Sequence, residues 1–307
     1  MKAFVSYKSV SWIRGIAEQL EEDLDIHFIK ARNGSLKRLN GGMVADRYDT
    51  IVRFGTYAGY VPAADKEYNK LEGIRNASDK LKARKIFMEE GVSTPYTWSR
   101  EEMMRADIAE VDLPVIGRPK SHCGGKGFYV YDSLMKLRDE LRYNRHDIHY
   151  FQSYIKKGRE FRVHVASGKA IIVAEKIVPE ENKDDYVWNL GSRGACEEFN
   201  TLRWGEYREF IVESCIREAA KAVNALGLDY GAVDVIVKGD SVFVLEVNTA
   251  PRLEEYGISR YAEYFKWLLL NPERQEFMTN PRRYSFTHED FERDYERFQR
   301  GELDDGI

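Results

Sequence analysis

The segment Tyr230–Pro251, YGAVDVIVKGDSVFVLEVNTAP, decides the fold predicted for this chain. Two runs of β-branched and apolar residues flank Gly239-Asp240, a pattern that predicts a β-hairpin. Three oxygen-bearing side chains, those of Asp234, Glu246 and Asn248, interrupt these runs. Because side chains alternate between the two faces of a strand, Glu246 and Asn248 share one face. The segment therefore predicts a hairpin that carries a small polar group on an apolar framework.

The place of Asp234 depends on the register of this hairpin. A two-residue turn at Gly239-Asp240 sets Asp234 opposite Leu245 and sends the carboxylates to opposite faces. A three-residue loop, Gly239-Asp240-Ser241, sets Asp234 opposite Glu246, and we predict this second register. Two carboxylates and an amide oxygen on one face suit Mg²⁺, which also takes water and substrate phosphates as ligands. A half-exposed hairpin with acids on its polar face is the alternative interpretation.

Composition sets wide bounds on the class of protein. A chain of 307 residues accommodates two or three domains. Its formal net charge of −4 gives no overall attraction to nucleic acid or to anionic membranes. Three cysteines without metal-ligand spacing indicate reduced thiols and a cytoplasmic compartment. No apolar run approaches transmembrane length, and the first residues lack the apolar core of a signal peptide, so we expect no membrane partner.

The periodicity of apolar residues predicts an α/β protein in four parts. Alternation of strand, helix and strand over residues 1–76 predicts a small parallel domain, with a loop at Asn33–Gly42. Residues 77–149 follow, beginning with a helix at Asn76–Gly91 for which Ser78 is the expected N-cap. Residues 150–270 contain consecutive antiparallel strands at His149–Ile155, Gly158–Ala166 and Lys169–Val178, then a helix and the hairpin. Residues 271–307 read as a charged, peripheral helical tail.

Three further features are candidates for binding. In the loop SHCGGKGF the glycines leave backbone N–H groups free to approach phosphate, and Lys126 adds charge; a plain hairpin loop is the alternative. Arg53 ends a strand of the parallel domain, where such sheets bind ligands, although a surface charge is an equal interpretation. The polar stretch Pro179–Thr201, which includes Asn189 and Arg193, has the length of a binding loop or lid.

Four segments in a fixed order resemble the ATP-grasp superfamily, and within it the carboxylate–amine ligases. They are ASDKLKARKIFMEEGVSTP, LPVIGRPKSHCGGKGF, YFQSYIKKGREFRV and VDVIVKGDSVFVLEVNTAP, and together they cover roughly Asn76 to Leu253. The motif VRFG followed by NASDKLKAR looks most like the predicted amidoligase branch found largely in phages. The resemblance implies an ATP-grasp fold that begins with a small N-terminal parallel α/β domain. A central lid subdomain and a C-terminal antiparallel subdomain follow, and these two clamp ATP between them.

The resemblance also implies roles for individual residues. The metal ligands are Asp234, Glu246 and Asn248. The cofactor-binding residues, for ATP, are Lys80, Arg118, Gly124, Gly125, Lys126, Gly127, Gln152, the backbone at Tyr154 and Ile155, Glu160, and Lys176. Arg118 and Gln152 stand where the family more often has lysine and glutamate, which keeps a cation and an acceptor at these places.

One departure from the family concerns the catalytic cation. Ligases of the D-alanine–D-alanine type carry an arginine two residues before the first metal aspartate, whereas this chain has Ala232. The cation must then come from elsewhere, and the candidate catalytic residues are Arg162, Arg193 and Arg252. We expect the substrate to be bound by Arg53, Asn189, Arg193 and Arg252.

The function implied is an ATP- and Mg²⁺-dependent ligase that forms an amide through an acyl phosphate, with Mn²⁺ as a substitute metal. Its partners would be small-molecule or peptide carboxylates and amines, and nucleic acid only as a modified substrate. A homodimer is expected, in the cytoplasm, which is the host cytoplasm if the chain is phage-encoded. Two alternatives stay open: a phosphotransferase that stops at phosphorylation, and a nucleotide-binding regulator without turnover. A basic groove of Arg32, Lys37, Arg38 and Arg47 would favour a macromolecular substrate; solvated surface charges are the alternative interpretation.

Overall fold

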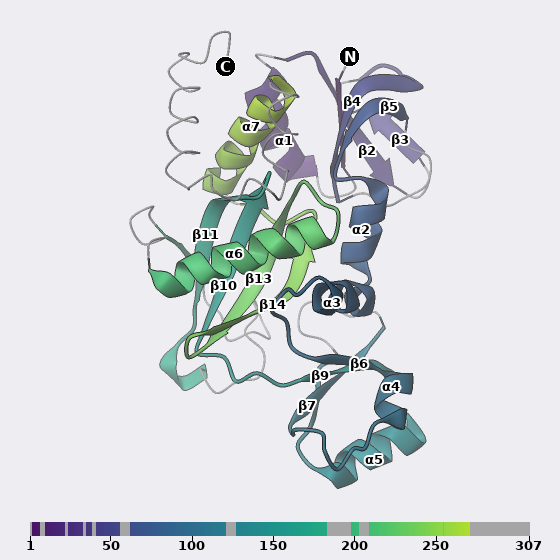
Figure 1. Ribbon diagram of the computed structural model, residues 1–307. Coiled ribbons are helices and arrows are strands. Elements are labelled where there is room, and N and C mark those ends of the chain that lie inside the picture. Colours follow the sequence, from purple (N-terminus) through teal and green to yellow (C-terminus); the bar gives the residue numbers. More distant parts are fainter. Residues whose placement is uncertain are drawn as a thin grey trace.

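In the part of the chain that the structure describes, three β-sheets follow one another along the molecule (Figure 1). Two have five strands and one has four, and the mixed α/β class predicted from the sequence is confirmed. No helix in the described ranges is long and apolar enough to cross a membrane. The computed structural model describes residues 2–6, 10–21, 24–32, 35–38, 41–55, 62–120, 127–182, 198–202, 209–253 and 255–270.

The first sheet lies at the top of Figure 1 and has the order β3-β2-β1-β4-β5. Its strands are parallel except β3, which pairs antiparallel with β2. The loop predicted at Asn33–Gly42 is therefore partly wrong, since β3 lies within it, and β5 was not predicted because its sequence AADKEY is mostly polar. The elements are β1 (Lys2–Ser6), α1 (Val10–Glu21), β2 (Ile26–Arg32), β3 (Ser35–Arg38), β4 (Arg47–Phe54) and β5 (Ala63–Tyr68).

Two short helices, α2 (Leu71–Ser78) and α3 (Lys80–Glu89), lead from the first sheet to the second. A single predicted helix with Ser78 as N-cap is wrong. Asp79 has extended backbone dihedrals and caps α3, its carboxylate accepting from the Lys82 N–H at 3.0 Å. The Ser78 hydroxyl instead donates to the Ile74 carbonyl at 2.7 Å. The chain therefore changes direction at Asp79, and this turn sets the direction of α3, which begins at Lys80.

The second sheet is antiparallel, with the order β6-β9-β7-β8. Helices α4 and α5 lie on its far side in Figure 1, and a small core fills the space between. The sequence placed β9 beside the next two strands; this is wrong, since β9 pairs with β6 and β7. The elements are β6 (Thr97–Ser99), α4 (Arg100–Arg105), β7 (Val115–Pro119), β8 (Tyr129–Tyr131), α5 (Leu134–Tyr143) and β9 (Ile148–Ser153).

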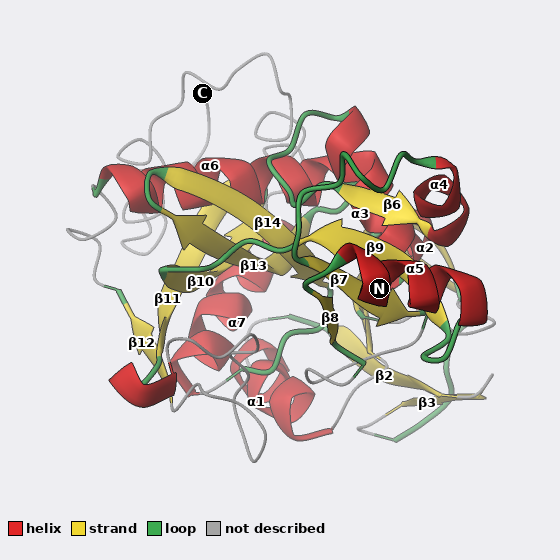
Figure 2. Ribbon diagram, turned by 90° about the horizontal axis from the view of Figure 1, so that it is seen from below, coloured by secondary structure: helices red, strands yellow, loops and turns green. Residues whose placement is uncertain are grey.

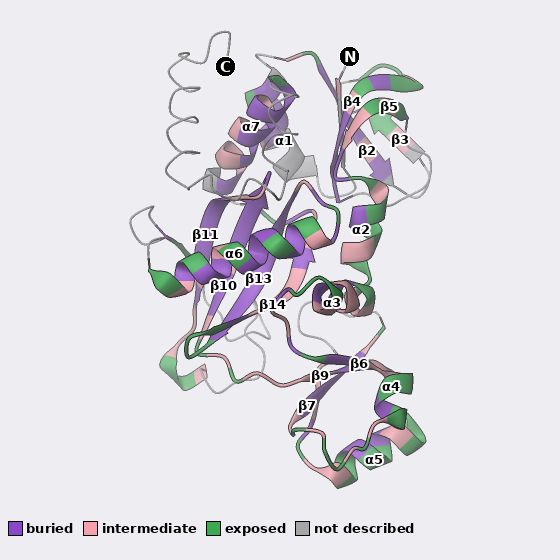
Figure 3. Cartoon of the chain, viewed as in Figure 1, coloured by how far each residue is buried: buried purple, intermediate pink, exposed green. Residues whose placement is uncertain are grey.

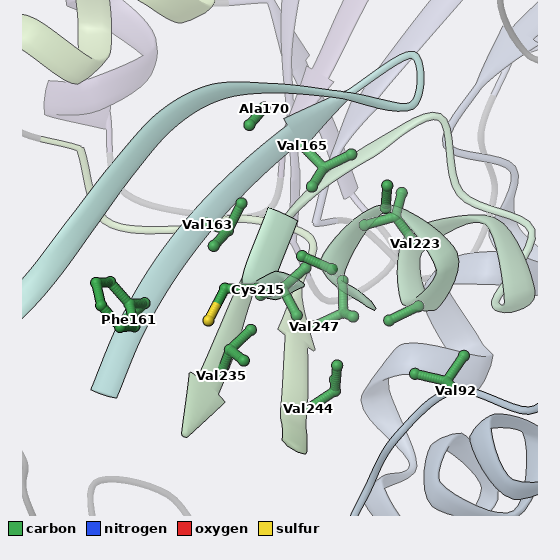
Figure 4. Packing of buried hydrophobic residues seen from close by; sticks show 14 of the residues in the cluster. Val92, Phe161, Val163, Val165, Ala170, Cys215, Val223, Val235, Val244 and Val247 are labelled. Carbon is green, nitrogen blue, oxygen red and sulfur yellow. The ribbon is translucent and has the colours of Figure 1, made fainter. Parts of the chain in front are cut away.

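The third sheet is antiparallel throughout, with the order β12-β11-β10-β13-β14. Helix α6 covers one face, where valines of the strands and Cys215 of the helix form the largest core (Figure 4). Figure 2 shows α6 on one side of these strands and α1 and α7 on the other. The elements are β10 (Arg159–Ala166), β11 (Lys169–Ile177), the short 3₁₀ helix η1 (Glu180–Asn182), β12 (Glu198–Thr201), α6 (Phe210–Ala225), β13 (Tyr230–Lys238), β14 (Ser241–Asn248) and α7 (Glu255–Leu270).

The first and third sheets share one core rich in aromatic residues, and Figure 3 colours much of α7 and of β10 and β11 as buried. The Tyr230 ring contacts Phe265 of α7 at a centroid distance of 5.0 Å, and Phe54 of β4 contacts Tyr261 at 6.0 Å. Asn69, in the left-handed conformation with φ +52°, adds hydrogen bonds to the backbone at the start of β13. These contacts hold the carboxyl end of β4 close to the end of the hairpin.

Candidate active site

The hairpin β13–β14 places Asp234 opposite Glu246, as predicted, but by a different route. Lys238 pairs with Ser241, so the turn has the two residues Gly239 and Asp240, and the predicted three-residue loop is wrong. The register shifts later, where Asp234 pairs with Glu246 and Val235 with Val244, which leaves Leu245 as an extra residue. This β-bulge moves Glu246 and Asn248 off the face that carries Val242 and Val244. The bulge, and not the turn, gathers the polar side chains.

A row of charged side chains crosses the open face of the third sheet. Arg162 of β10 pairs in register with Asp234, which pairs in turn with Glu246. The Arg162 guanidinium donates to both Asp234 oxygens, Nε to Oδ1 at 2.7 Å and Nη2 to Oδ2 at 2.9 Å. Burial by itself would raise the pKa of Asp234, but the charges of Arg162 and Lys176 outweigh it and hold this pKa at about 2. Asp234 is therefore ionised at neutral pH.

Glu160 lies one step further along the same face. It is 3% exposed and accepts from Lys157 at 3.0 Å and from Lys176 of β11. Burial lowers the pKa of Lys157, while for Lys176 the carboxylates of Glu160 and Asp234 outweigh burial and raise the pKa. Glu160, Arg162 and His164 alternate with apolar residues along β10 and share one face. His164 is covered by α7 and bonds to the Tyr261 hydroxyl at 3.0 Å.

The third acid, Glu246, contacts α3. Its carboxylate forms an ion pair with Lys80, in the first turn of α3, and accepts from the Asn248 amide at 3.2 Å. The Glu246 side chain is 32% exposed, whereas that of Asp234 is 9% exposed. The predicted metal ligands therefore lie together, and a cation holds each of the two carboxylates.

The second sheet supplies the opposite side of the site. Arg118 pairs in register with Tyr150 and Ile116 with Gln152, so Arg118 and Gln152 point away from the core under α4 and α5. Arg118 is 9% exposed, bonds to the Tyr150 hydroxyl and lies 5.2 Å from the Phe128 ring centroid. Burial lowers the pKa of Arg118, and Glu246 partly offsets this effect. Arg118 of the second sheet and Glu246 of the third sheet therefore interact electrostatically.

The backbone after β9 is less open than the sequence suggests. The Tyr154 N–H donates to the Pro114 carbonyl at 3.2 Å, so this donor is occupied within the second sheet. The prediction that Tyr154 offers a backbone group to adenine is therefore limited to its carbonyl. Ile155 is half-buried and follows directly.

Several predicted residues lie elsewhere. Arg252 is exposed just beyond the hairpin, so it is available to a ligand there. Arg53 is 2% exposed and holds Glu67 through two bonds of 3.0 and 2.9 Å, which makes the surface-charge interpretation wrong. Gly127 adopts φ +63° next to the glycine-rich loop. Gly124, Gly125, Lys126, Asn189 and Arg193 lie outside the described residues, as does the tail 271–307.

Sequence reasoning missed Arg84. This residue of α3 is 5% exposed and donates to the Thr94 hydroxyl at 2.7 Å and to the Val244 carbonyl at 3.1 Å. Burial lowers its pKa to about 10, so it stays charged at neutral pH. A signal was present, because Arg84 is one helical turn after Lys80 and one turn before the buried Phe87.

The donor set fits a divalent cation bound with a polyphosphate. Two carboxylates and one amide oxygen meet at Asp234, Glu246 and Asn248, and hard cations prefer such oxygens. No group of three or more His, Cys, Asp and Glu side chains placed to hold a metal occurs in the described part, so a metal here would need further oxygens. Positive charge predominates around the three carboxylates of Glu160, Asp234 and Glu246; the cations are Lys80, Arg84, Arg118, Lys157, Arg162 and Lys176. This excess suits phosphate oxygens.

The family follows from a match to the ATP-grasp domain over residues 77–254, more than half of the chain. The chain belongs to the ATP-grasp family. That match includes Lys80, the second sheet and the whole of the third sheet, and it confirms the resemblance seen in the sequence at the level of the superfamily. The phage-associated branch stays a prediction.

Similar proteins are ligases by name. A tetrahydromethanopterin:alpha-L-glutamate ligase of Methanococcus maripaludis is 25% identical over 211 residues, which span 66% of each chain. The structure of a D-alanine–D-alanine ligase from Bacillus anthracis with ATP superposes with a TM-score of 0.56 at 17% identity, over 91% of this chain and 98% of that one. The ATP-grasp ligase PsnB with minimal precursor, Mg and ADP gives 0.54 at 15% identity, over 84% and 91%. These two structures share the fold.

Proposed function

We propose that this chain is an ATP- and Mg²⁺-dependent carboxylate–amine ligase that releases ADP and phosphate. The observation that carries the proposal is the row Arg162, Asp234 and Glu246, which lies in register on one face with Lys80 and Lys176 beside it. Carboxylates that would bind a metal and cations that would bind phosphate stand together on this face. Family membership and the names of the relatives support the same reaction.

The reaction joins two substrates in two steps. A carboxylate oxygen of the first substrate forms a bond to the γ-phosphorus of ATP as the bond to the β-phosphate oxygen breaks, and ADP leaves. The amine nitrogen of the second substrate then attacks the acyl carbon, the C–O bond to phosphate breaks, and the amine loses a proton. Mg²⁺, held by Asp234, Glu246 and Asn248, would supply charge neutralisation at the phosphates.

The chain's own cations would have to change partners when ATP binds. Lys80 and Arg162 now neutralise Glu246 and Asp234, and the γ-phosphate would draw them away once a metal replaces them at the carboxylates. Arg118 and the backbone at Tyr154 and Ile155 would face the nucleotide from the second sheet, with Gln152 accepting from the adenine amino group. Closure of the two sheets would exclude water from the acyl phosphate.

The amine and carboxylate substrates would enter from the first sheet. Gly55, after β4, approaches Ala250 so closely that a Cβ on Gly55 would lie 2.2 Å from the Ala250 Cβ. This contact brings the end of β4 against the end of the hairpin, beside the exposed Arg252. We propose Arg252 and Arg193 as ligands of the substrate carboxylate and the tetrahedral oxyanion, with Asn189 and Arg53 lining the pocket.

Chemistry and the names of the relatives guide the choice of substrates to supply. Since relatives are named for the addition of L-glutamate, glutamate is the first amine to supply. Free metabolites and peptides are both suitable carboxylates, and a modified nucleic acid would be a substrate only through an exposed carboxylate or amine. We further propose that Mn²⁺ replaces Mg²⁺ and that the protein is a cytoplasmic homodimer.

Transfer of ¹⁸O tests the reaction. The protein is incubated with Mg-ATP, a mixture of ¹⁸O-carboxylates and L-glutamate, and both the products and the released phosphate are weighed by mass spectrometry. A ligase gives a new amide, one ADP per amide, and phosphate that carries one ¹⁸O atom. ADP with a stable phosphorylated substrate and no amide would indicate the phosphotransferase. Glu246→Gln serves as the matched control and should yield neither product.

A further inference from the structure

The bulge at Leu245 is held from outside the hairpin. Strand β14 is the edge of the third sheet, so the N–H and C=O groups on its outer side have no neighbouring strand. At Val244, directly before the bulge, both groups are nevertheless bonded. The Val244 N–H donates to the Ser93 carbonyl at 2.7 Å, and the Val244 carbonyl accepts from Thr94 Oγ1 at 2.9 Å and from Arg84 Nη1 at 3.1 Å.

Arg84 and Thr94 also bond to each other. Arg84 Nη1 donates to Thr94 Oγ1 at 2.7 Å, which leaves the hydroxyl hydrogen directed at the Val244 carbonyl. A buried guanidinium and a hydroxyl thus converge on one carbonyl oxygen. We call these two side chains the bulge clamp. A charge-assisted bond of this kind is roughly twice as strong as a neutral one.

The clamp limits where the extra residue of β14 can lie. Val244 must keep its backbone turned outward to meet the clamp, so the strand stays regular up to that residue. Val247 is buried in the core beneath α6, which fixes its side chain to the opposite face from Glu246. The extra residue is therefore confined between these two valines. Glu246, the residue that follows the bulge, has its position set by both constraints.

The same arginine fixes α3. Lys80 and Arg84 are separated by one helical turn and both reach β14, the first through the Glu246 carboxylate and the second through the Val244 backbone. A movement of Arg84 would displace Lys80 and Glu246 together. We propose that Arg84 and Thr94 are positioning residues for the metal and phosphate site, acting through the bulge at Leu245. This inference rests on the proposed function, because it concerns the ligands named there.

Manganese binding, measured by electron paramagnetic resonance in the presence of ADP, tests the clamp without turnover. Thr94→Val keeps the shape of the side chain and loses the hydroxyl, and Arg84→Met keeps most of the length and loses the charge. We expect each variant to bind Mn²⁺ in the ADP complex roughly tenfold more weakly, which is the usual effect of losing a group that orients a metal ligand. Arg84→Lys, which restores one donor and the charge, should recover part of the loss.

Two control variants separate positioning from general damage. Lys82→Met removes a charge from the exposed side of α3, and Ser93→Ala removes a hydroxyl whose partner is the Val242 carbonyl, upstream of the bulge. Both should bind Mn²⁺ like the wild type. Thermal unfolding of every variant, recorded in parallel, restricts the comparison to folded protein.

The outcomes distinguish the two proposals. If the wild-type ADP complex binds no Mn²⁺, the metal assignment and the proposed function fail together. If the wild type binds Mn²⁺ and folded Thr94→Val and Arg84→Met bind it equally well, the clamp is structural only and this inference is wrong. Weaker binding in Thr94→Val with unchanged binding in Ser93→Ala supports it.

Discussion

Arg162 and Asp234 form a two-point ion pair across neighbouring strands, with donor–acceptor distances of 2.7 and 2.9 Å. The pair lies at the centre of the open face of the third sheet, between Glu246 on one side and Lys176 on the other. A carboxylate on a side chain that is 9% exposed depends on such a partner, because burial disfavours its charge. The pair therefore stabilises the buried charge of Asp234 in this state, and we propose that Asp234 binds metal and Arg162 binds phosphate once nucleotide is bound.

Replacing Arg162 by Met should separate the contribution of the ion pair to stability from its contribution to ATP turnover. The variant leaves Asp234 buried without its main partner, and we expect the free energy of unfolding to fall by about 3–5 kcal/mol. A double variant, Arg162→Met with Asp234→Leu, removes both charges and should recover most of that stability without ATP turnover. Urea unfolding gives the first quantity and ADP release the second. Full recovery of turnover in the double variant would contradict the metal assignment of Asp234.

Loss of the Glu246 carboxylate should abolish chemistry and spare the fold. Glu246→Gln keeps the shape and the hydrogen bond to Asn248 but loses the charge toward a metal. Since metal-ion stabilisation is worth several kcal/mol, ADP release should fall by roughly a hundredfold or more. Turnover within a factor of about two of the wild type, which is well under 1 kcal/mol, would reject Glu246 as a ligand.

His164 should make the protein sensitive to acid. Burial and the charge of Arg162 lower its folded pKa to about 3, from an ordinary value of 6.5. The unfolded chain therefore binds a proton that the folded chain refuses, so this contribution to stability is complete above pH 6.5 and is lost as the pH falls toward 3. In that window the free energy of unfolding of His164→Gln should fall less steeply, by up to about 1.4 kcal/mol per pH unit. Equal slopes in urea titrations at several pH values would show that His164 accepts its proton in the folded state.

Gly55 should be irreplaceable for a local reason. It adopts φ +67°, and a Cβ there would lie 2.2 Å from the Ala250 Cβ. We expect Gly55→Ala to lower the free energy of unfolding by roughly 2–4 kcal/mol, from overpacking and from backbone strain. Adding Ala250→Gly should recover about half, since only the overpacking is relieved. Gly239→Ala, with φ +56° and no atom within 4 Å, is the control for strain alone and should cost less.

The pairing of Asp234 with Glu246 was predicted correctly from the sequence, but the feature that produces this pairing was not. In a regular strand Glu246 and Asn248 would share the face of Val242 and Val244, and the bulge at Leu245 moves them to the face of Asp234. The bulge at Leu245 depends on contacts from Arg84, Ser93 and Thr94, about 150 residues earlier in the chain. No local pattern in β14 reports such contacts. The sequence therefore led to the right pairing through the wrong turn.

Contacts between distant parts of the chain explain the other differences between the predicted and the observed structure. Strand β5 is mostly polar and lies at a sheet edge, where alternation of apolar residues is weak. Strand β9 read as the first of three hairpin-connected strands, because proximity in sequence is the only guide available before the sheets are known. The spacing of Arg84 from Lys80 and Phe87 indicates a shared side of α3, but only the structure shows that Arg84 contacts β14. Among the residues implied by the family resemblance, Lys80, Glu246 and Asn248 contact one another, as do Glu160 and Lys176, while the roles of all of them stay predictions.

The most direct test is a crystal structure with a non-hydrolysable ATP analogue and Mn²⁺, whose anomalous signal locates the metal. Our account predicts a peak bound by Asp234, Glu246 and Asn248 and bridged to the phosphates, with Lys80 turned from Glu246 toward the nucleotide. A bound nucleotide with no peak at these residues, and with the Arg162–Asp234 and Lys80–Glu246 pairs unchanged, would contradict it.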